Sequence, residues 1–297
     1  RGSIHAIIGE NGAGKTTLMN VLFGLLQPDE GEILIDGQPT QFANPAAAIA
    51  AGIGMVHQHF KLVPSLTVAE NVFLGMEIVK GGLIDHAAQI ERTAELSRRF
   101  GLKVDPTERV GLLSVGIEQR IEILKVLARG ARTIILDEPT AVLTPQESRD
   151  LFETLRGFVA QGMTVLFISH HLEEVMEVSD TVTVLRHGRE VATKPTSELT
   201  KSDLVQMMVG RLVSFDRRPR PPVAGAPVLA VDDLWARNDR GLHALRGVSF
   251  NVRAGEIVGI AGVAGNGQTE LAEVLSGLRP STHGAVSLAG RPLTGLS

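Results

Sequence analysis

One stretch near the start of the chain constrains the fold more than any other. Residues 9–17 fit the pattern Gly-x-x-x-x-Gly-Lys-[Ser/Thr]. An apolar run precedes them at residues 4–8, and apolar residues at helical spacing follow until Gln27 and Pro28 stop the pattern. A buried strand, a glycine-rich turn and a helix in this order predict the phosphate-binding loop of an α/β protein.

The residue types of this loop predict its chemistry. Glycines allow backbone N–H groups to close around a phosphate chain at a helix N-terminus. Lys15 can supply a positive charge to the β- and γ-phosphates, and the Thr16 hydroxyl can ligate Mg²⁺. The alternative is a glycine turn that only joins a strand to a helix, and the complete match disfavours it. The residues expected to bind nucleotide here are Gly9, Glu10, Asn11, Gly12, Ala13, Gly14, Lys15, Thr16 and Thr17.

Composition excludes several other classes of protein. The 297 residues, 43% of them hydrophobic, can bury a substantial core in one or two domains. A net charge of -4 predicts no broad basic surface, so we expect no nucleic-acid partner. The lack of cysteine removes disulfides and thiolate metal sites. No apolar run approaches the ~18 residues of a spanning helix and no signal-peptide pattern opens the chain, so we expect a partner to supply any membrane span.

Three further apolar runs are typical of buried strands, and each ends in polar residues. These polar residues are Gln58, then Asp137 with Glu138, then His170 with His171. Because ligands of open parallel sheets bind at the carboxyl ends of strands, we expect these side chains near the phosphate loop. Asp137 can hold Mg²⁺ and Glu138 can order an attacking water, Gln58 can touch either, and a neutral His170 can hydrogen-bond a γ-phosphate. Taken singly, each also fits a purely structural role.

Two other segments predict smaller parts of the fold. Residues 31–37 have the alternation and glycine bounds of a short strand and a tight turn, which predicts a small β layer beside the main sheet. Residues 68–100 have a helical pattern with Ala87, Ile90 and Ala94 on one apolar face. We therefore expect a helical insertion between the halves of the sheet core.

A second possible anion site lies at residues 114–116. Ser114 and Gly116 come directly before a helix whose apolar face includes Ile117, Ile121 and Leu124. A helix N-terminus attracts anions, and ordinary N-capping by the serine is the alternative.

In this order, the elements resemble the nucleotide-binding domain of ATP-binding-cassette (ABC) proteins over nearly all of residues 1–212. The resemblance implies an α/β P-loop NTPase fold with a parallel sheet core, a small β layer and a helical subdomain. It implies a Walker A loop at Gly9–Thr16, the Q-loop glutamine at Gln58, the signature at Leu113–Gln119, the Walker B aspartate at Asp137, the catalytic glutamate at Glu138 and the switch histidine at His170. The signature departs from the common form because Val115 stands where glycine is usual and Gln119 follows Ile117 and Glu118. Ser114 and Gly116, the phosphate-facing pair, are retained.

The resemblance also implies how the chemistry would work. In that family two cassettes meet head to tail, and each ATP lies between one Walker A loop and the opposite signature. ATP and Mg²⁺ are then the cofactors, with Thr16, Gln58 and Asp137 near the metal. Glu138 would polarise the attacking water, while His170 and Lys15 would stabilise charge on the transferred phosphoryl group.

The sequence contains the beginning of a second copy. Residues 260–269 align with residues 7–16 at a constant offset of 262 minus 9, or 253, and the register continues without gaps. We therefore expect a first ABC domain at 1–212, a linker at 213–226 and the N-terminal part of a second domain at 227–297. Gln268 replaces Lys15 in the second loop, which predicts weak hydrolysis there because a phosphate loses a nearby positive charge.

The same offset predicts that the chain is a fragment of a tandem-cassette protein. Residues 228–253 have no counterpart before Arg1, and Ser297 corresponds to Asn44. The missing opening would include the loop where the family usually stacks an aromatic ring on adenine. Alone, this chain is expected to hydrolyse ATP poorly.

Unequal fused cassettes with a short linker resemble the ATPase subunits of bacterial sugar-type importers. Residues 54–64 and 262–269 look most like the nucleoside-importing branch. The resemblance implies transmembrane permease subunits as partners, a substrate-binding protein that acts indirectly, a second cassette in the full-length chain, and a place at the cytoplasmic face of the membrane. A soluble tandem cassette acting on ribosomes is the alternative, although such proteins usually carry a long charged linker and intact signatures. A kinase would leave the signature and the duplicated loop unexplained.

Overall fold

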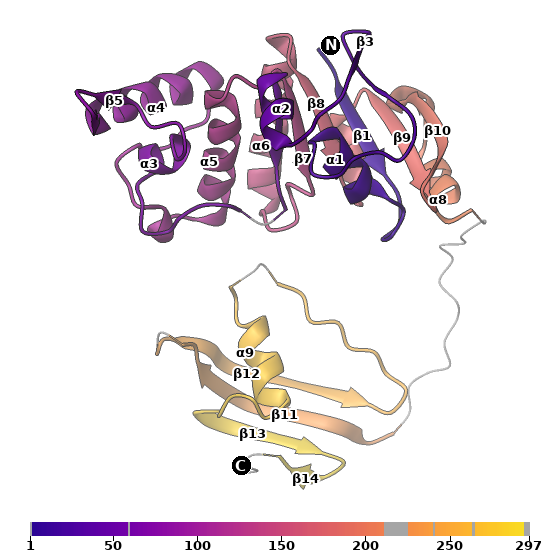
Figure 1. The fold of residues 1–297 in the computed structure, drawn as a ribbon. Helices are drawn as coiled ribbons and strands as arrows, with labels where there is room; N and C mark the ends of the chain where they lie inside the picture. Colours follow the sequence, from indigo (N-terminus) through magenta and orange to yellow (C-terminus); the bar gives the residue numbers. More distant parts are fainter. Residues whose placement is uncertain (1, 59, 211–224, 240, 263–264, 294–297) are drawn as a thin grey trace. The chain divides into compact units, whose positions relative to one another are not determined.

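The computed structural model describes residues 2–58, 60–210, 225–239, 241–262 and 265–293, and it divides the chain into two compact units. The first unit is Arg1–Ser214 and the second is Phe215–Ser297, and each is described by itself (Figure 1). The linker predicted at 213–226 lies outside the described residues except for its last two positions.

A six-stranded sheet forms the centre of the first unit, in the order β10-β9-β1-β8-β7-β4. Its strands are β1 (Ile4–Ile8), β4 (Ile53–Val56), β7 (Thr133–Asp137), β8 (Thr164–Ile168), β9 (Thr181–Arg186) and β10 (Arg189–Pro195). Neighbouring strands pair in parallel, apart from β10, which runs antiparallel to β9 at one edge. The predicted parallel sheet core is therefore confirmed, and its carboxyl ends share one edge.

Helices cover both faces of this sheet, and further helices of the first unit pack on other helices. They are α1 (Lys15–Leu22), α2 (Pro45–Ala50), α3 (Val68–Val72), α4 (His86–Phe100), α5 (Val115–Ala128), α6 (Pro145–Ala160), α7 (Leu172–Val178) and α8 (Lys201–Val209). Because side chains alternate along a strand, Ile4, Ala6 and Ile8 of β1 join one hydrophobic core, while Ile7 joins a second core with Met19 of α1. Figure 1 shows α3, α4 and α5 grouped at one end of the first unit, away from β1, β9 and β10.

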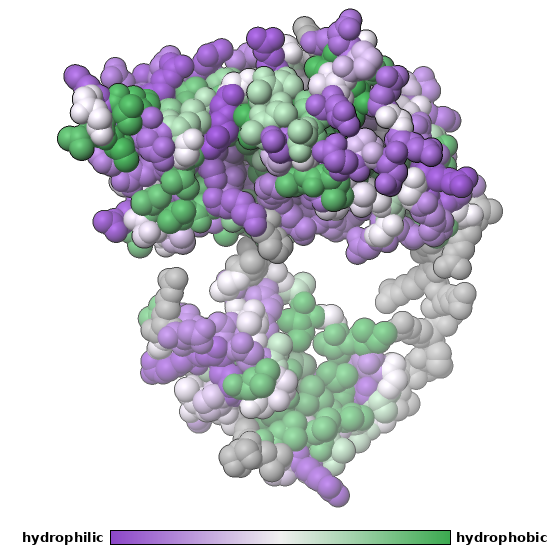
Figure 2. Space-filling model, in the orientation of Figure 1, coloured by the Kyte–Doolittle hydropathy of each residue, from purple (hydrophilic) through white to green (hydrophobic). Residues whose placement is uncertain are grey.

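Small hairpins complete the first unit. The pair β2 (Ile33–Ile35) and β3 (Gln38–Thr40) confirms the predicted small β layer. A second pair, β5 (Val79–Lys80) and β6 (Leu83–Ile84), interrupts the helical pattern expected at 68–100. Figure 2 shows apolar residues on the surface at this hairpin, where Val79, Leu83 and Ile84 are exposed.

The prediction that Ala87, Ile90 and Ala94 form the buried face of α4 is wrong. Ala87 and Ile90 are exposed, whereas Gln89 and Thr93 are buried beside Leu96. The buried Thr93 hydroxyl donates to the Gln89 backbone carbonyl at 2.8 Å, which satisfies the hydroxyl without water. The helix therefore packs a partly polar face on its neighbours.

The second unit is a smaller α/β assembly. Its elements are β11 (Pro227–Arg237), β12 (His243–Arg253), β13 (His283–Leu288), β14 (Arg291–Pro292) and α9 (Gln268–Leu275). The strands form one antiparallel sheet in the order β12-β11-β13-β14. Leu271 of α9 is buried in the same core as Val231, Leu245 and Val286 of the sheet.

The backbone confirms the internal repeat. Helix α1 begins at Lys15 and α9 at Gln268, and both span eight residues. The φ angles of Gly12 and Gly14 are 82° and 99°, and those of their counterparts Gly265 and Gly267 are 85° and 96°. Residues 257–261, the counterpart of β1, belong to no strand in the described part of the second unit. No helix within the described ranges has both the length and the apolar character needed to cross a membrane.

Candidate nucleotide-binding site

The loop between β1 and α1 is braced from within and from a neighbouring turn. Its Ala13 N–H donates to the Glu10 carbonyl at 3.0 Å, and the Gly188 N–H from the β9–β10 turn donates to the Ala13 carbonyl at 3.0 Å. Gly14 caps α1 in the left-handed region, at a φ of 99°, which glycine adopts without steric cost. The sequence thus fixes a concave backbone at the N-terminus of α1.

Lys15 is buried beneath this loop, with 7% of its surface exposed. Its Nζ donates to the carbonyls of Gly9 at 2.6 Å and Glu10 at 3.1 Å. No described carboxylate forms an ion pair with Lys15. The ammonium group is therefore held in place by neutral acceptors, and its charge remains available to an anion.

Asp137 and Glu138 follow each other at the end of β7. Burial, followed by the nearby charge of Glu138, raises the pKa of the Asp137 carboxyl, and His57 and Lys15 oppose this rise. Glu138 has a φ of 48°, which is uncommon for a residue with a side chain, and its N–H donates to the Ile168 carbonyl of β8 at 3.0 Å. Both carboxylates nevertheless line the same cavity.

Two side chains from neighbouring strands hold the Glu138 carboxylate. The His170 ring nitrogen Nδ1 lies 2.9 Å from Oε1, and the Gln58 amide Nε2 donates to Oε2 at 3.3 Å. Gln58 follows β4 and His170 follows β8, so the strand order places one on each side of β7. The arrangement presents a fixed, ionisable acceptor, which is what a general base for an attacking water requires.

All of these groups line one cavity of about 940 Å³. It is lined by the nine loop residues Gly9 to Thr17 together with Gln58, Asp137, Glu138, His170 and Met208. The cavity thus places a buried cation and backbone donors together with two carboxylates and a histidine. Met208, from α8, was missed because a single methionine carries no motif.

Ser114 and Gly116 do not line this cavity. Ser114 caps α5 without a side-chain hydrogen bond to the helix. A Cβ on Gly116 would lie 2.3 Å from Oε1 of Glu147, so the start of α5 lies directly against the Glu147 side chain of α6. Gly116 instead lines a separate hollow between α4, α5 and α6.

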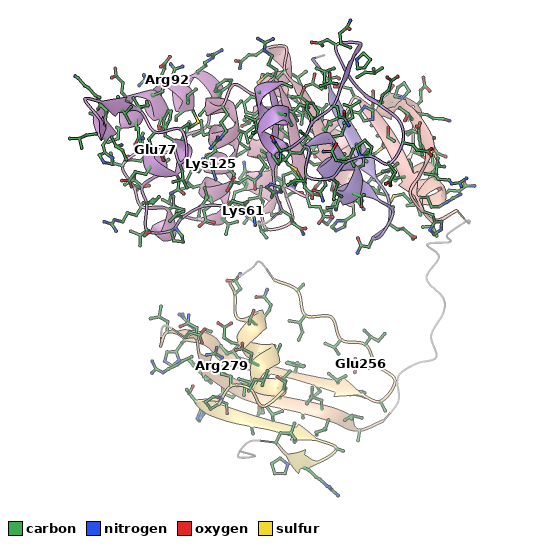
Figure 3. The ribbon with its side chains drawn as sticks, in the orientation of Figure 1. Lys61, Glu77, Arg92, Lys125, Glu256 and Arg279 are labelled. Carbon is green, nitrogen blue, oxygen red and sulfur yellow. The ribbon has the colours of Figure 1, made fainter. Side chains whose placement is uncertain are left out.

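The segment after Gln58 is tied to α5, a feature that the sequence pattern did not reveal. The Lys61 N–H donates to the buried Glu122 carboxylate at 2.5 Å, and Nζ of Lys125 donates to the Lys61 carbonyl at 2.8 Å. Both lysines are labelled in Figure 3. Burial, and then the charge of Lys61, lowers the pKa of His57, whose ring meets Phe23 edge-on.

The residues expected to contact Mg²⁺ offer only oxygen atoms to a cation. Thr16, Gln58 and Asp137 all line the cavity and can supply a hydroxyl, an amide and a carboxylate oxygen. No group of three or more His, Cys, Asp or Glu in the described ranges could hold a metal by itself. This donor set suits Mg²⁺, which commonly takes one or two protein oxygens, with phosphate and water completing its shell.

The second loop places Gln268 where the first has Lys15. A Cβ on Gly262 would lie 2.2 Å from Gln268 Nε2, so the amide end lies against the Gly262 backbone. Residues 263 and 264, which the repeat predicts to be part of this loop, lie outside the described residues.

The first unit's fold and cavity define the class of protein, a P-loop nucleotide-binding cassette. The family model described as "ABC transporter" matches residues 1–141 and 245–296. The chain belongs to the ABC transporter family.

Curated relatives align with nearly the whole length of this chain, and almost half of the aligned residues are identical. The guanosine import ATP-binding protein NupO of Bacillus subtilis (strain 168) is 47% identical over 100% of this chain and 58% of its own length. The nucleoside import ATP-binding protein NupA of Lactococcus lactis is 45% identical over 99% of this chain and 58% of its own length. A ribose import ATP-binding protein, RbsA 1 of Rubrobacter xylanophilus, is 47% identical over 98% of this chain and 57% of its own length. The chain thus spans well under two thirds of the length of these relatives.

Solved structures support the same fold. The crystal structure of the ADP conformation of an ATP-binding cassette of an ABC transporter superposes with a TM-score of 0.62 at 27% identity, covering 71% of this chain and 89% of that one. A nucleotide-free ATP-binding cassette from an ABC transporter superposes with a TM-score of 0.59 at 26% identity, covering 71% of this chain and 85% of that one. The fold is therefore the predicted ABC cassette.

Proposed function

We propose that this chain is part of the ATP-hydrolysing subunit of an ABC importer that takes up nucleosides or simple sugars, with nucleosides favoured. The observation that supports it most is the single cavity shared by Lys15, Asp137, Glu138 and His170. The names of the relatives, which import guanosine, nucleosides or ribose, favour this function over a ribosome-associated cassette.

In this proposal the loop residues bind the phosphates of ATP and each polar side chain has one task. Lys15 and the loop N–H groups bind the β- and γ-phosphates. Thr16, Gln58 and Asp137 hold Mg²⁺, which neutralises charge on the phosphates when bound. Glu138 accepts a hydrogen bond from the attacking water and orients it, and His170 holds Glu138 and the γ-phosphate region in register.

A complete site requires a second cassette. Ser114 and Gly116 lie outside the cavity of their own unit, as a signature that reaches the ATP of an opposite cassette would. We propose a first cassette at 1–212, a linker at 213–226 and the start of a second cassette at 227–297. The partners are transmembrane permease subunits, with a substrate-binding protein acting through them, and the subunit is peripheral on the cytoplasmic face of the membrane.

Uptake by living cells tests the proposal. Labelled nucleosides and labelled pentoses are supplied to cells whose own complete gene carries Lys15→Ala, with Lys80→Ala, on the exposed β5–β6 hairpin, as the control. We expect nucleoside uptake to be lost and the control to behave like the unaltered cells. Selective loss of pentose uptake would keep the importer and change its substrate. If both uptakes survived, a non-transport ATPase would replace the proposal.

A further inference from the structure

A carboxylate outside the cavity joins the two loops that carry Glu138 and His170. Oε2 of Glu174, on α7, accepts a hydrogen bond from the Thr140 hydroxyl at 2.6 Å and another from the Ser169 hydroxyl at 3.3 Å. Thr140 lies two residues after Glu138, and Ser169 directly precedes His170. One carboxylate oxygen therefore bridges the ends of β7 and β8.

The hydroxyl groups in this bridge are buried, and their bonding continues into the backbone. Thr140 is 5% exposed and Ser169 is 1% exposed. Ser169 Oγ also accepts the N–H of His171 at 2.9 Å, so the chain on both sides of His170 is fixed. Hydrogen bonds from buried hydroxyls to a charged acceptor are stronger than neutral ones, because little water competes for them.

The bridge supports a local geometry at Glu138 that needs restraint from its surroundings. Glu138 has a positive φ, a backbone conformation that persists only where its surroundings enforce it. Its carboxylate must also stay 2.9 Å from the His170 ring. The hydrogen bond from the Glu138 N–H to the Ile168 carbonyl also ties the two loops, and Glu174, which is not among the residues that line the cavity, adds a second tie.

We propose that Glu174 is a positioning residue for ATP hydrolysis, which holds Glu138 and His170 in register by clasping Thr140 and Ser169. This inference rests on the proposed ATPase function. Glu174 does not line the cavity, so it acts through the two loops and not on nucleotide. Its loss should therefore slow the chemical step and leave ATP binding intact.

The test uses the complete gene product in the membranes of cells that express it. Glu174→Ala is expected to lower kcat for ATP hydrolysis about tenfold while KM for ATP changes less than about twofold. Glu174→Gln keeps an oxygen acceptor for Thr140 and should retain most of kcat. Glu173→Ala is the matched control, because its carboxylate lies on the same helix and pairs with the exposed Lys201 of α8.

Thr140→Val separates positioning from general stability, because valine keeps the volume of threonine and removes only the hydroxyl. It should reproduce the loss seen in Glu174→Ala, and the double variant should lose no more than either single variant, since both break one bridge. If Glu174→Ala does not fold, Thr140→Val alone decides the question.

Three results would overturn the inference. They are an unchanged kcat in both variants, a KM that rises in step with the fall in kcat, and additive losses in the double variant. A complete, unaltered protein that hydrolyses no ATP would instead overturn the proposed function, and the inference with it.

Discussion

The two glycine-rich loops of this chain share the backbone conformation of their last two glycines and differ in the side chain that follows. Gly14 and Gly267 precede their helices at φ angles of 99° and 96°. Behind the first loop lies the buried ammonium group of Lys15, and at the same position the second loop has the neutral amide of Gln268. The spacing of the glycines is thus matched by the same φ angles, and we expect the one exchanged side chain to decide how strongly each loop binds phosphate.

The strands that lead into the loops differ more than the loops do. Ile4 and Ile7 of β1 are 2% and 6% exposed, whereas their counterparts Ile257 and Ile260 are 74% and 54% exposed. In the first unit, β8 and β9 flank β1, and no described strand of the second unit pairs with residues 257–261. A tight turn is a local property of its residues, whereas a central strand depends on its neighbours.

The largest effect is expected at Glu138, since Glu138 is the proposed general base and the first unit holds the proposed hydrolysis site. Glu138→Gln removes the proton acceptor and keeps the side chain's size, so hydrolysis should fall at least about a hundredfold while ATP still binds. Binding is measured by calorimetry and turnover by phosphate release, both with the complete gene product. Hydrolysis at the unaltered rate would show that the chemistry lies elsewhere.

Alanine in place of glycine tests how tightly each loop is packed. A Cβ on Gly9 would lie 2.4 Å from the Leu185 carbonyl oxygen, so Gly9→Ala should lower the free energy of unfolding of the first unit by about 1–3 kcal/mol. The three atoms nearest to a Cβ on Gly262 all belong to the flexible Gln268 side chain, so Gly262→Ala should cost less than about 0.5 kcal/mol.

Urea denaturation can follow the two units separately. The single tryptophan, Trp235, lies in the second unit, so its fluorescence reports that unit, while amide hydrogen exchange reports the first. Equal losses in the two alanine variants would contradict the difference in packing.

A lysine at position 268 should make the second loop more like the first. A unit charge near phosphate is worth about 4 kcal/mol at ~4 Å and an effective dielectric constant of ~20, before desolvation is subtracted. We therefore expect Gln268→Lys to raise ATP affinity about tenfold in a Lys15→Ala background, where the first loop no longer contributes to ATP binding. Gln268→Met, which changes the amide without adding charge, is the control, and an equal gain there would argue against charge.

The smallest effect is expected from acidification, which should lower the free energy of unfolding of the first unit. Burial lowers the pKa of His5 and His57 below the ordinary value of 6.5, so the unfolded chain binds protons that the folded unit does not. The free energy of unfolding should then fall as the pH drops below 6.5. Val258 occupies the position of His5 in the second unit, so His5→Val should flatten the pH dependence of hydrogen exchange in the first. An unchanged profile would contradict this.

Local patterns predicted the parts of the site that local geometry determines. The apolar runs that became β4, β7 and β8 delivered Gln58, Glu138 and His170 to one cavity, because parallel strands end at a common edge. The offset of the repeat likewise located α9.

Long-range packing determined what the sequence did not predict. The buried face of α4 contains Gln89 and Thr93 and not Ile90, because α3 and α5 decide which side of the helix is covered. The hydrogen bonds of the Glu122 and Glu174 carboxylates span long stretches of sequence. Glu122 lies 61 positions from its partner Lys61, and Glu174 lies 34 positions from its partner Thr140, so no spacing rule predicts either contact.

Exchanging the lysine tests the central comparison most directly. Lys15→Gln gives the first loop the side chain of the second, and ATP binding is measured by calorimetry beside the control Lys80→Gln. We predict a loss of affinity of roughly a hundredfold, since a fixed charge on the phosphates is removed while the loop backbone persists. Affinity within about twofold of the unaltered protein would contradict the claim that this single charge distinguishes the two loops.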